Sequence, residues 1–491
     1  MSPIPKPPDL PLSQEDWDAL PVHVQGVFLV YVGSLEERIR TLAERVRELE
    51  EEVRVLRARL NQDSSNSSKP PSSDPPGAKR KYRQRERGGR PAGAQAGHEG
   101  ARRATVPAEK VTKVEEHRPA RCEACGRDIG GAPMVEGNHR RQVVEIPEIV
   151  PDVTEHRVFG AQCACGHTTW GEFPPEAAFG TGPRLTALAA ELSGRYRLSR
   201  EETADLLSDV LGVPICKGTV QACCERTSEA LAEPVAEVER ALPDAPVVHM
   251  DETGWKVAGK KAWLWVFATA MTALFVVHPR RGRDILEHLF GKGRPGVAVS
   301  DRWCAYSFFD PESRQLCWSH LLRDLVGIVD AKGEGSGPAQ PMVEAAARMF
   351  SDWHAFLRGE IVRAVLAERI APFRETLRAF AEAGFAQEPD RKWWGLGRDL
   401  VRYWPAVFRF VDVEGVEPTN NAAEQAVRPG VLWRRSSQGT RSEAGSLFVG
   451  RMLTTAATCR RQGRNLLAFL EAAVLARLHK RAPPGLLPSS A

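Results

Sequence analysis

The sequence has 491 residues, of which 42% are hydrophobic and 26% are charged, with a formal net charge of +4. These values are typical of a globular chain with two to four domains, and they exclude a wholly disordered or fibrous protein. Basic residues nevertheless gather in the segments 79–90 and 428–464, which favours a polyanionic partner such as nucleic acid. A solvated charge run without a partner is the alternative.

The first twenty residues are rich in proline and acidic side chains and lack the apolar core of a signal peptide. The longest apolar stretch, Ala262–His278, is shorter than the ~20 residues of a membrane helix. Its aromatic and β-branched residues instead predict two strands joined by a tight turn. We therefore expect a cytoplasmic protein with reduced cysteines and no membrane partner.

A heptad repeat marks the first predicted element. One core position holds Val32, Ile39, Val46, Val53 and Leu60, and the position three residues later holds Leu35, Leu42, Leu49 and Leu56. This pattern favours a parallel two-stranded coiled coil, so we expect a homodimer or a larger homo-oligomer. The alternative is a single amphipathic helix packed on its own chain.

A segment rich in serine and proline, 61–78, follows the coil and predicts a linker, because it has too few apolar groups to fold. The basic run after it begins with Lys79, Arg80 and Lys81, which we predict to contact DNA.

Two close cysteine pairs come next, Cys122-x-x-Cys125 and Cys163-x-Cys165. Such pairs predict a structural Zn²⁺ site, although His167 could replace one sulfur. Buried or inert thiols are the alternative. The partly alternating apolar residues in 143–153 predict short strands between the pairs.

A helix-turn-helix outline is predicted further along the chain. Ser199 and Glu202 form a capping box for the first helix, and Gly212 lies in the turn before the second. The second helix would present Lys217, Gln221 and Arg226 to DNA. A helical hairpin without DNA binding is the alternative.

The pattern then changes to strands. Strands are predicted at 245–250, 261–270, 272–277, 296–300 and 315–318, with a helix at 283–290 after the third strand. This order suits a ribonuclease H-like sheet, in which an acid from the first strand meets one from the fourth. Asp251 and Asp301 occupy these places. Either one could instead cap a turn.

Paired carboxylates suit a two-metal reaction, in which two Mg²⁺ ions about 3.5–4 Å apart activate a hydroxyl and stabilise the leaving oxygen of a phosphodiester. A third acid, Glu424, stands at the start of a predicted helix. With Asn421 as N-cap, Glu424 could equally close a capping box, so the spacing alone leaves its role open.

Several of these pieces, in this order, carry a family resemblance. They are the leucine-rich coil, the segment Asn66–Asp74, the cysteine pairs, the helical region, Asp251-Glu252-Thr253, Ser300-Asp301, Cys317-x-x-His320 and Thr419-Asn420-Asn421-x-x-Glu424. Over nearly its whole length the chain resembles the insertion-sequence-66 family of bacterial DDE transposases. The one-residue spacing in Cys163-x-Cys165 departs from the two that are usual in the family, which puts the fourth zinc ligand in doubt.

The resemblance implies that Asp251, Asp301 and Glu424 bind Mg²⁺ (or Mn²⁺) as the catalytic triad, and that a helical insertion separates the fifth strand from Glu424. It also implies a structural or DNA-handling role for Cys317 and His320 near the active site. Cys-x-x-His could otherwise be half of a zinc site, but no second pair lies nearby in sequence.

These expectations add up to a multidomain α/β fold. The predicted units are 1–62 with the coiled coil, 63–105 as a disordered basic linker, 106–180 as the zinc-binding module, 181–240 as the helix-turn-helix region, 241–332 and 416–480 as the two parts of the ribonuclease H-like catalytic domain, and 333–415 as the helical insertion.

The expected function is that of a nucleoid-associated bacterial transposase. It would bind terminal inverted repeats, hydrolyse the phosphodiester at the transposon ends and join the 3′ ends to target DNA, with accessory proteins of the element as possible partners. Arg428, Arg434, Arg435 and Arg441 would contact phosphates. The alternatives are a non-catalytic dimeric DNA-binding regulator, and a nuclease on the same fold without strand transfer.

Overall fold

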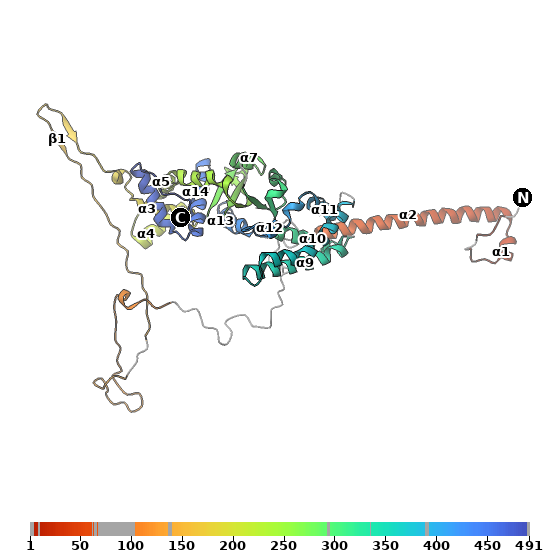
Figure 1. Ribbon diagram of the computed structural model, residues 1–491, viewed down its shortest axis with the longest axis horizontal. Helices are drawn as coiled ribbons and strands as arrows, with labels where there is room; N and C mark the ends of the chain where they lie inside the picture. The colour runs from red at the N-terminus through yellow and green to blue at the C-terminus, as the bar shows by residue number, and fades with distance from the viewer. Residues whose placement is uncertain are drawn as a thin grey trace.

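The computed structural model describes residues 4–7, 10–60, 62, 66, 104–135, 140–291, 295–333, 335–387 and 392–488. A central body contains the larger sheet and most of the helices (Figure 1). The long helix α2 (Val22–Leu60) extends from one end of this body, and the hairpin that includes β1 (Gly160–Gln162) extends from the other. None of the helices among the described residues is long and apolar enough to span a membrane.

A five-stranded mixed sheet lies at the centre of the fold. Its strands are β3 (Val247–Val257), β4 (Lys260–Ala268), β5 (Ala273–His278), β6 (Val297–Ser300) and β7 (Arg314–Leu316). Their order across the sheet is β5-β4-β3-β6-β7. The pairs β3–β4 and β4–β5 are antiparallel, and the pairs β3–β6 and β6–β7 are parallel. The protein therefore has a mixed α/β fold.

The predicted strand order is confirmed, with shifts at two places. The apolar stretch Ala262–His278 forms β4 and β5, as its aromatic and β-branched content predicts. β3 continues beyond Asp251, which was predicted to end the strand. Trp318 was predicted to end the fifth strand but begins helix α8 (Trp318–Asp330). Its indole nitrogen donates to the carbonyl of Val407, and this long-range contact is invisible to a local pattern.

Strand β6 is buried on both faces, and its residues alternate between two hydrophobic cores. Val297 and Val299 belong to one core and Ala298 belongs to the other, because successive side chains of a strand point to opposite faces. The end of β6 therefore lies between the two cores, and this is where Asp301 is located.

Helices cover both cores. The core that contains Ala298 is covered by α3 (Pro183–Gly194), α4 (Arg200–Leu211), α5 (Lys217–Ala230), α6 (Ala232–Ala241), α7 (Asp284–Phe290), α13 (Asn421–Ser437), α14 (Glu443–Arg461) and α15 (Leu466–Leu478). The core that contains Val297 is covered by α8, α9 (Ser336–Leu357), α10 (Arg363–Phe385), α11 (Lys392–Arg402) and α12 (Arg409–Asp412).

The N-terminal and cysteine-bearing parts contribute little to these cores. A short helix α1 (Gln14–Asp18) precedes α2, and β1 pairs antiparallel with β2 (Thr168–Trp170). The strands predicted within 143–153 are wrong, because this segment has no regular structure. Its apolar side chains, such as Val143 and Val153, are exposed and have no neighbouring strand to pair with.

Candidate active site

The register of the parallel strands brings the first two predicted acids to the same end of the sheet. His249 on β3 is opposite Val299 on β6, and each acid, Asp251 or Asp301, lies two residues further along its strand. Burial raises the pKa of Asp251 well above its ordinary range, and the negative charges of Glu252, Asp301 and Glu424 raise it further. The three predicted acids therefore lie close enough for their charges to interact, although their carboxylate oxygens do not all come within 4.8 Å of one another.

Asp301 also makes the local contact that the turn-capping alternative requires. One of its carboxylate oxygens, Oδ1, accepts a hydrogen bond from the backbone amide of Trp303 at 2.8 Å. A carboxylate has two oxygens and about four lone-pair sites, so this bond leaves capacity for a cation. The turn and the metal-binding interpretation are therefore compatible at this residue.

Glu424 does not close a capping box. Helix α13 begins at Asn421 and its N-cap is Asn420, which makes no side-chain capping bond. The side chain of Asn420 instead donates to the carbonyl of Met250 at 2.6 Å. The helix that carries Glu424 is thereby attached to the strand residue next to Asp251, and the carboxylate of Glu424 does not serve the N-cap.

Cys317 contacts both the last residue of β6 and the N-cap residue of α13. Its backbone amide donates to the carbonyl of Ser300 at 2.9 Å, and its sulfur accepts the backbone amide of Asn420 at 3.2 Å. Burial raises the pKa of the Cys317 thiol to about 11. One turn along α8, Nδ1 of His320 lies 3.7 Å from Oε1 of Glu424, and burial lowers the pKa of His320.

Glu252 is a further acidic residue beside Asp251 and Asp301, and no role was predicted for it. Its carboxylate pairs with Arg281 at 2.6 Å and accepts a hydrogen bond from the hydroxyl of Tyr306. Burial raises the pKa of Glu252, and the charge of Asp301 adds to this effect. The adjacency of two acids in the sequence was the available signal, but the partners of Glu252 come from distant segments.

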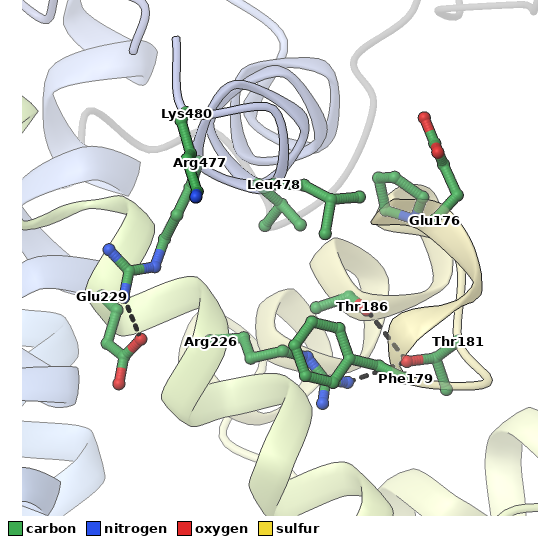
Figure 2. Close-up of a pocket in the computed structure, with 11 residues that line it drawn as sticks. Glu176, Phe179, Thr181, Thr186, Arg226, Glu229, Arg477, Leu478 and Lys480 are labelled. Carbon is green, nitrogen blue, oxygen red and sulfur yellow. Dashed lines mark hydrogen bonds and ion pairs between the residues drawn. The ribbon is translucent and has the colours of Figure 1, made fainter. Parts of the chain in front are cut away.

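The three residues of α5 that were predicted to contact DNA do not share one face. Lys217 and Gln221 are exposed, but Arg226 is half-buried on the opposite side of the helix. The Arg226 guanidinium donates to Thr181 at 2.8 Å and lies 4.5 Å from the centre of the Phe179 ring. Figure 2 shows it in a pocket of about 360 Å³ that also contains the Arg477–Glu229 pair. The prediction that Arg226 faces DNA beside Lys217 is therefore wrong, because nine residues at 100° each turn the side chain by half a circle.

The predicted phosphate contacts on α13 and just after it also differ among themselves. Arg428, Arg435 and Arg441 are exposed, whereas Arg434 is half-buried and donates to the carbonyl of Gly254 at 3.1 Å. Burial lowers the pKa of Arg434. Arg434 therefore fastens α13 to β3. The predicted contacts Lys79, Arg80 and Lys81 lie outside the described residues.

The cysteine pairs each form a tight turn. Gly126 and Gly166 follow the second cysteine of each pair with φ of +71° and +86°, a conformation that favours glycine. Hydrogen bonds from the amide of Cys125 lower the pKa of Cys122, and those from the amide of Cys165 lower the pKa of Cys163. All four cysteines are described, yet no three of their sulfurs lie within 4.8 Å of one another. Each pair thus forms a turn of its own, and the structure does not bring the two pairs together.

The donor set at the sheet end suits a hard divalent cation. Asp251, Asp301 and Glu424 offer carboxylate oxygens, which are the ligands that Mg²⁺ prefers. The mutual repulsion that raises the pKa of Asp251 would be relieved by a cation among them.

Comparison with protein families supplies the class of the protein. Residues 181–447, more than half of the chain, match the family described as Transposase IS66 family, and the chain belongs to this family. Residues 24–104 match a second family, described as a family of unknown function (DUF6444). No curated protein matches the chain.

Proposed function

We propose that this transposase-family protein is a metal-dependent DDE enzyme that cleaves the ends of its element and joins the 3′ ends to target DNA. The observation that carries the proposal is the proximity of Asp251, Asp301 and Glu424 at one end of the sheet, where the charges of Asp301 and Glu424 act on Asp251. They come from β3, the end of β6 and α13, and their charges act on Asp251 together.

The sheet supports a ribonuclease H-like assignment for the catalytic domain. Across the sheet, in the order β5-β4-β3-β6-β7, two antiparallel pairings are followed by two parallel ones. This order places β3 and β6, the first and fourth strands of this sheet in chain order, side by side. Asp251 within β3 and Asp301 just after β6 each lie two residues beyond the paired residues His249 and Val299, so the two acids occupy matching positions on neighbouring strands. The insertion helices α9–α12 lie between α8 and α13 in the chain and pack in the core that contains Val297.

The three carboxylates would hold Mg²⁺ or Mn²⁺, which activates a water or a 3′-hydroxyl and stabilises the leaving oxygen of the phosphodiester. The protein's own contribution is to fix the carboxylates. Asn420 holds the start of α13 against Met250, and Cys317 holds the start of α8 against Ser300. Both attachments are made one residue before a candidate metal ligand, Asp251 or Asp301.

DNA recognition is proposed for the helices and basic segments around this domain. The turn between α4 and α5 contains Gly212 with φ of +63°, and Ser199 and Glu202 form the predicted capping box. Lys217 is exposed on α5, and Arg428, Arg435 and Arg441 are exposed on and after α13. Gln221 is also exposed, but its side-chain amide is hydrogen-bonded to Arg200 and Glu225 and would have to exchange these partners to contact DNA. The coil, the cysteine pairs and the basic run Lys79–Lys81 would add dimerisation and further contacts to the terminal repeats.

The test uses the full-length protein with a DNA duplex that carries the element's end. Asp251→Ala, Asp301→Ala and Glu424→Ala should each abolish Mg²⁺-dependent cleavage, by at least about a hundredfold, while DNA affinity stays within about threefold. Gln425→Ala, an exposed change next to Glu424, is the matched control and should keep full activity.

Three results would redirect the assignment. Full cleavage by Asp251→Ala would eliminate the metal triad, and DNA binding by the native protein without any Mg²⁺-dependent cleavage would favour the DNA-binding regulator. Cleavage by the native protein without joining of the 3′ ends to a target duplex would identify a nuclease on the same fold.

A further inference from the structure

A second group of metal-ligating atoms lies beside the acidic triad. Sγ of Cys317, a ring nitrogen of His320 and a carboxylate oxygen of Glu424 all lie within 4.8 Å of one another. Among the described residues, no other group of three or more cysteine, histidine or acidic side chains meets this condition. We propose that Cys317, His320 and Glu424 form a binding site for a thiophilic divalent ion of the Zn²⁺ type, separate from the magnesium site.

The distances require only a small closure to accommodate such an ion. Zinc binds sulfur at about 2.3 Å and nitrogen or oxygen at about 2.0–2.2 Å, so tetrahedral ligands stand roughly 3.3–3.8 Å apart. Nδ1 of His320 is already 3.7 Å from Oε1 of Glu424. The sulfur can close the remaining gap by a movement of about 1 Å or less. Three protein ligands leave the fourth position open to solvent or DNA.

Burial raises the pKa of Cys317 in the metal-free protein, so a bound cation has to displace the thiol proton, but two features of its surroundings favour the thiolate. Cys317 is the N-cap of α8, so its sulfur lies at the positive end of a thirteen-residue helix. The amide of Asn420 donates to this sulfur from a separate element. A backbone amide that donates to the sulfur of a metal-bound cysteine stabilises its negative charge and fixes its orientation.

His320 supplies an independent observation that points to a ligand. Its Nδ1 is buried and has no hydrogen-bond partner among the described residues, and a buried polar atom without a partner is costly. Because Cys317 and His320 are three residues apart at the start of α8, they project from the same face toward Glu424. An ion at this position would satisfy the nitrogen.

The donor types separate this site from the magnesium site. Sulfur and imidazole ligands favour Zn²⁺ or Co²⁺, whereas Mg²⁺ favours carboxylate oxygens and water. Glu424 belongs to both sites, and one oxygen can serve each ion. The softer ion would then hold Glu424 in place for the triad. The consequence for catalysis rests on the proposed function, but the binding site itself does not.

The test is a Co²⁺ titration of the full-length protein in which Cys122, Cys125, Cys163 and Cys165 are all replaced by serine. Co²⁺ bound to a thiolate gives an intense near-ultraviolet charge-transfer band. We expect this band to saturate at about one ion per chain and to be competed away by Zn²⁺ but not by Mg²⁺. This measurement needs no DNA and no catalytic activity.

Two ligand variants and one control make the result specific. Cys317→Ser should abolish the band, and His320→Gln should weaken Co²⁺ binding by about tenfold or more. Cys459→Ser removes a thiol of α14 that is as deeply buried as Cys317, and it should keep the band. Circular dichroism checks that each variant is folded. If Cys317→Ser does not fold, His320→Gln decides whether the ion binds at this site.

The proposal is overturned if the parent gives no band, or if the band survives both Cys317→Ser and His320→Gln. Loss of Mg²⁺-dependent cleavage is a separate outcome. A band without cleavage would support this site while contradicting the proposed function, and cleavage without a band would do the reverse.

Discussion

Asn420 and Cys317 show how single residues position the carboxylates. Asn420 has two contacts with different elements, one from its amide nitrogen to Cys317 and one from its side chain to Met250. The backbone amide of Trp318 also donates to the carbonyl of Pro418 at 2.8 Å. These bonds hold the starts of α8 and α13 against β3 and β6, so that no acid needs to use its own oxygens for this purpose.

Asp251 gives a stability prediction whose sign follows from its pKa. Because the folded protein raises the pKa of Asp251, this carboxyl contributes stability below its ordinary pKa of 3.8, and the contribution is lost as the pH rises through the folded pKa. At pH 7, Asp251→Asn should therefore raise the Tm of the metal-free protein by about 1–2 °C, the effect of about 1 kcal/mol on a chain of this size.

Calorimetry at several pH values checks this prediction. The gain in Tm of Asp251→Asn should shrink as the pH falls toward 3.8. With Mg²⁺ added, the native protein should have the higher Tm of the two, because an ion that binds the native acid stabilises the fold. Asp152→Asn, at an exposed acid in the loop before β1, is the control and should leave the Tm unchanged. A lower Tm for metal-free Asp251→Asn at pH 7 would contradict the account.

At the scale of elements, α2 carries an apolar stripe that its own chain leaves uncovered. Ile39 is 65% exposed and Leu42 is 64% exposed, and the other heptad leucines are also exposed. The end of the helix is held by Arg54, whose guanidinium donates to the carbonyl of Ala331 at 3.0 Å. The alternative of a helix packed on its own chain therefore finds no support along the stripe.

The coiled-coil hypothesis predicts that a charge in the stripe weakens self-association. Leu42→Glu should raise the dimer dissociation constant by at least about a hundredfold, since burial of a core leucine is worth about 2–5 kcal/mol. Glu44→Gln lies away from the heptad core and should leave the dimer intact. Light scattering after size exclusion measures both, and a Leu42→Glu protein that stays dimeric would exclude the coil as the interface.

At the scale of the whole molecule, the site lies where two separately packed cores meet. Arg302, next to Asp301, pairs with Asp324 of α8 at 2.6 Å and with Asp399 of α11 at 2.5 Å. The end of β6 is thereby linked to the insertion helices, while Asp251 and Glu424 are held from the other core. Movement of the insertion would be transmitted to Asp301 through this arginine.

The cysteine pairs predict metal binding at the same scale. If Zn²⁺ joins the two turns, native protein should contain about one more zinc ion per chain than Cys125→Ser, because loss of one of four ligands opens a closed site. Cys216→Ser, an exposed thiol outside both pairs, should keep the native zinc content. Elemental analysis after extensive dialysis gives the counts, and equal zinc in all three proteins would refute the site.

The sequence by itself determined the order of strands and helices and two of the three acids. Strand periodicity is local, so β3 and β6 could be predicted, and with them Asp251 and Asp301 as acids on neighbouring strands, although β3 continues beyond Asp251. The long helix and its heptads were predicted for the same reason. The start of the helix that carries Glu424 was also visible, but spacing alone left the role of this acid open.

Only the tertiary structure decided which side chains of these elements meet. It moved the N-cap of α13 to Asn420, placed Arg226 against Thr181 and placed Glu424 beside Cys317 and His320. Residues about a hundred positions apart share no local pattern, and their contact depends on how the two cores pack against the sheet. For this reason the third ligand of the proposed zinc-type site could not be found in the sequence.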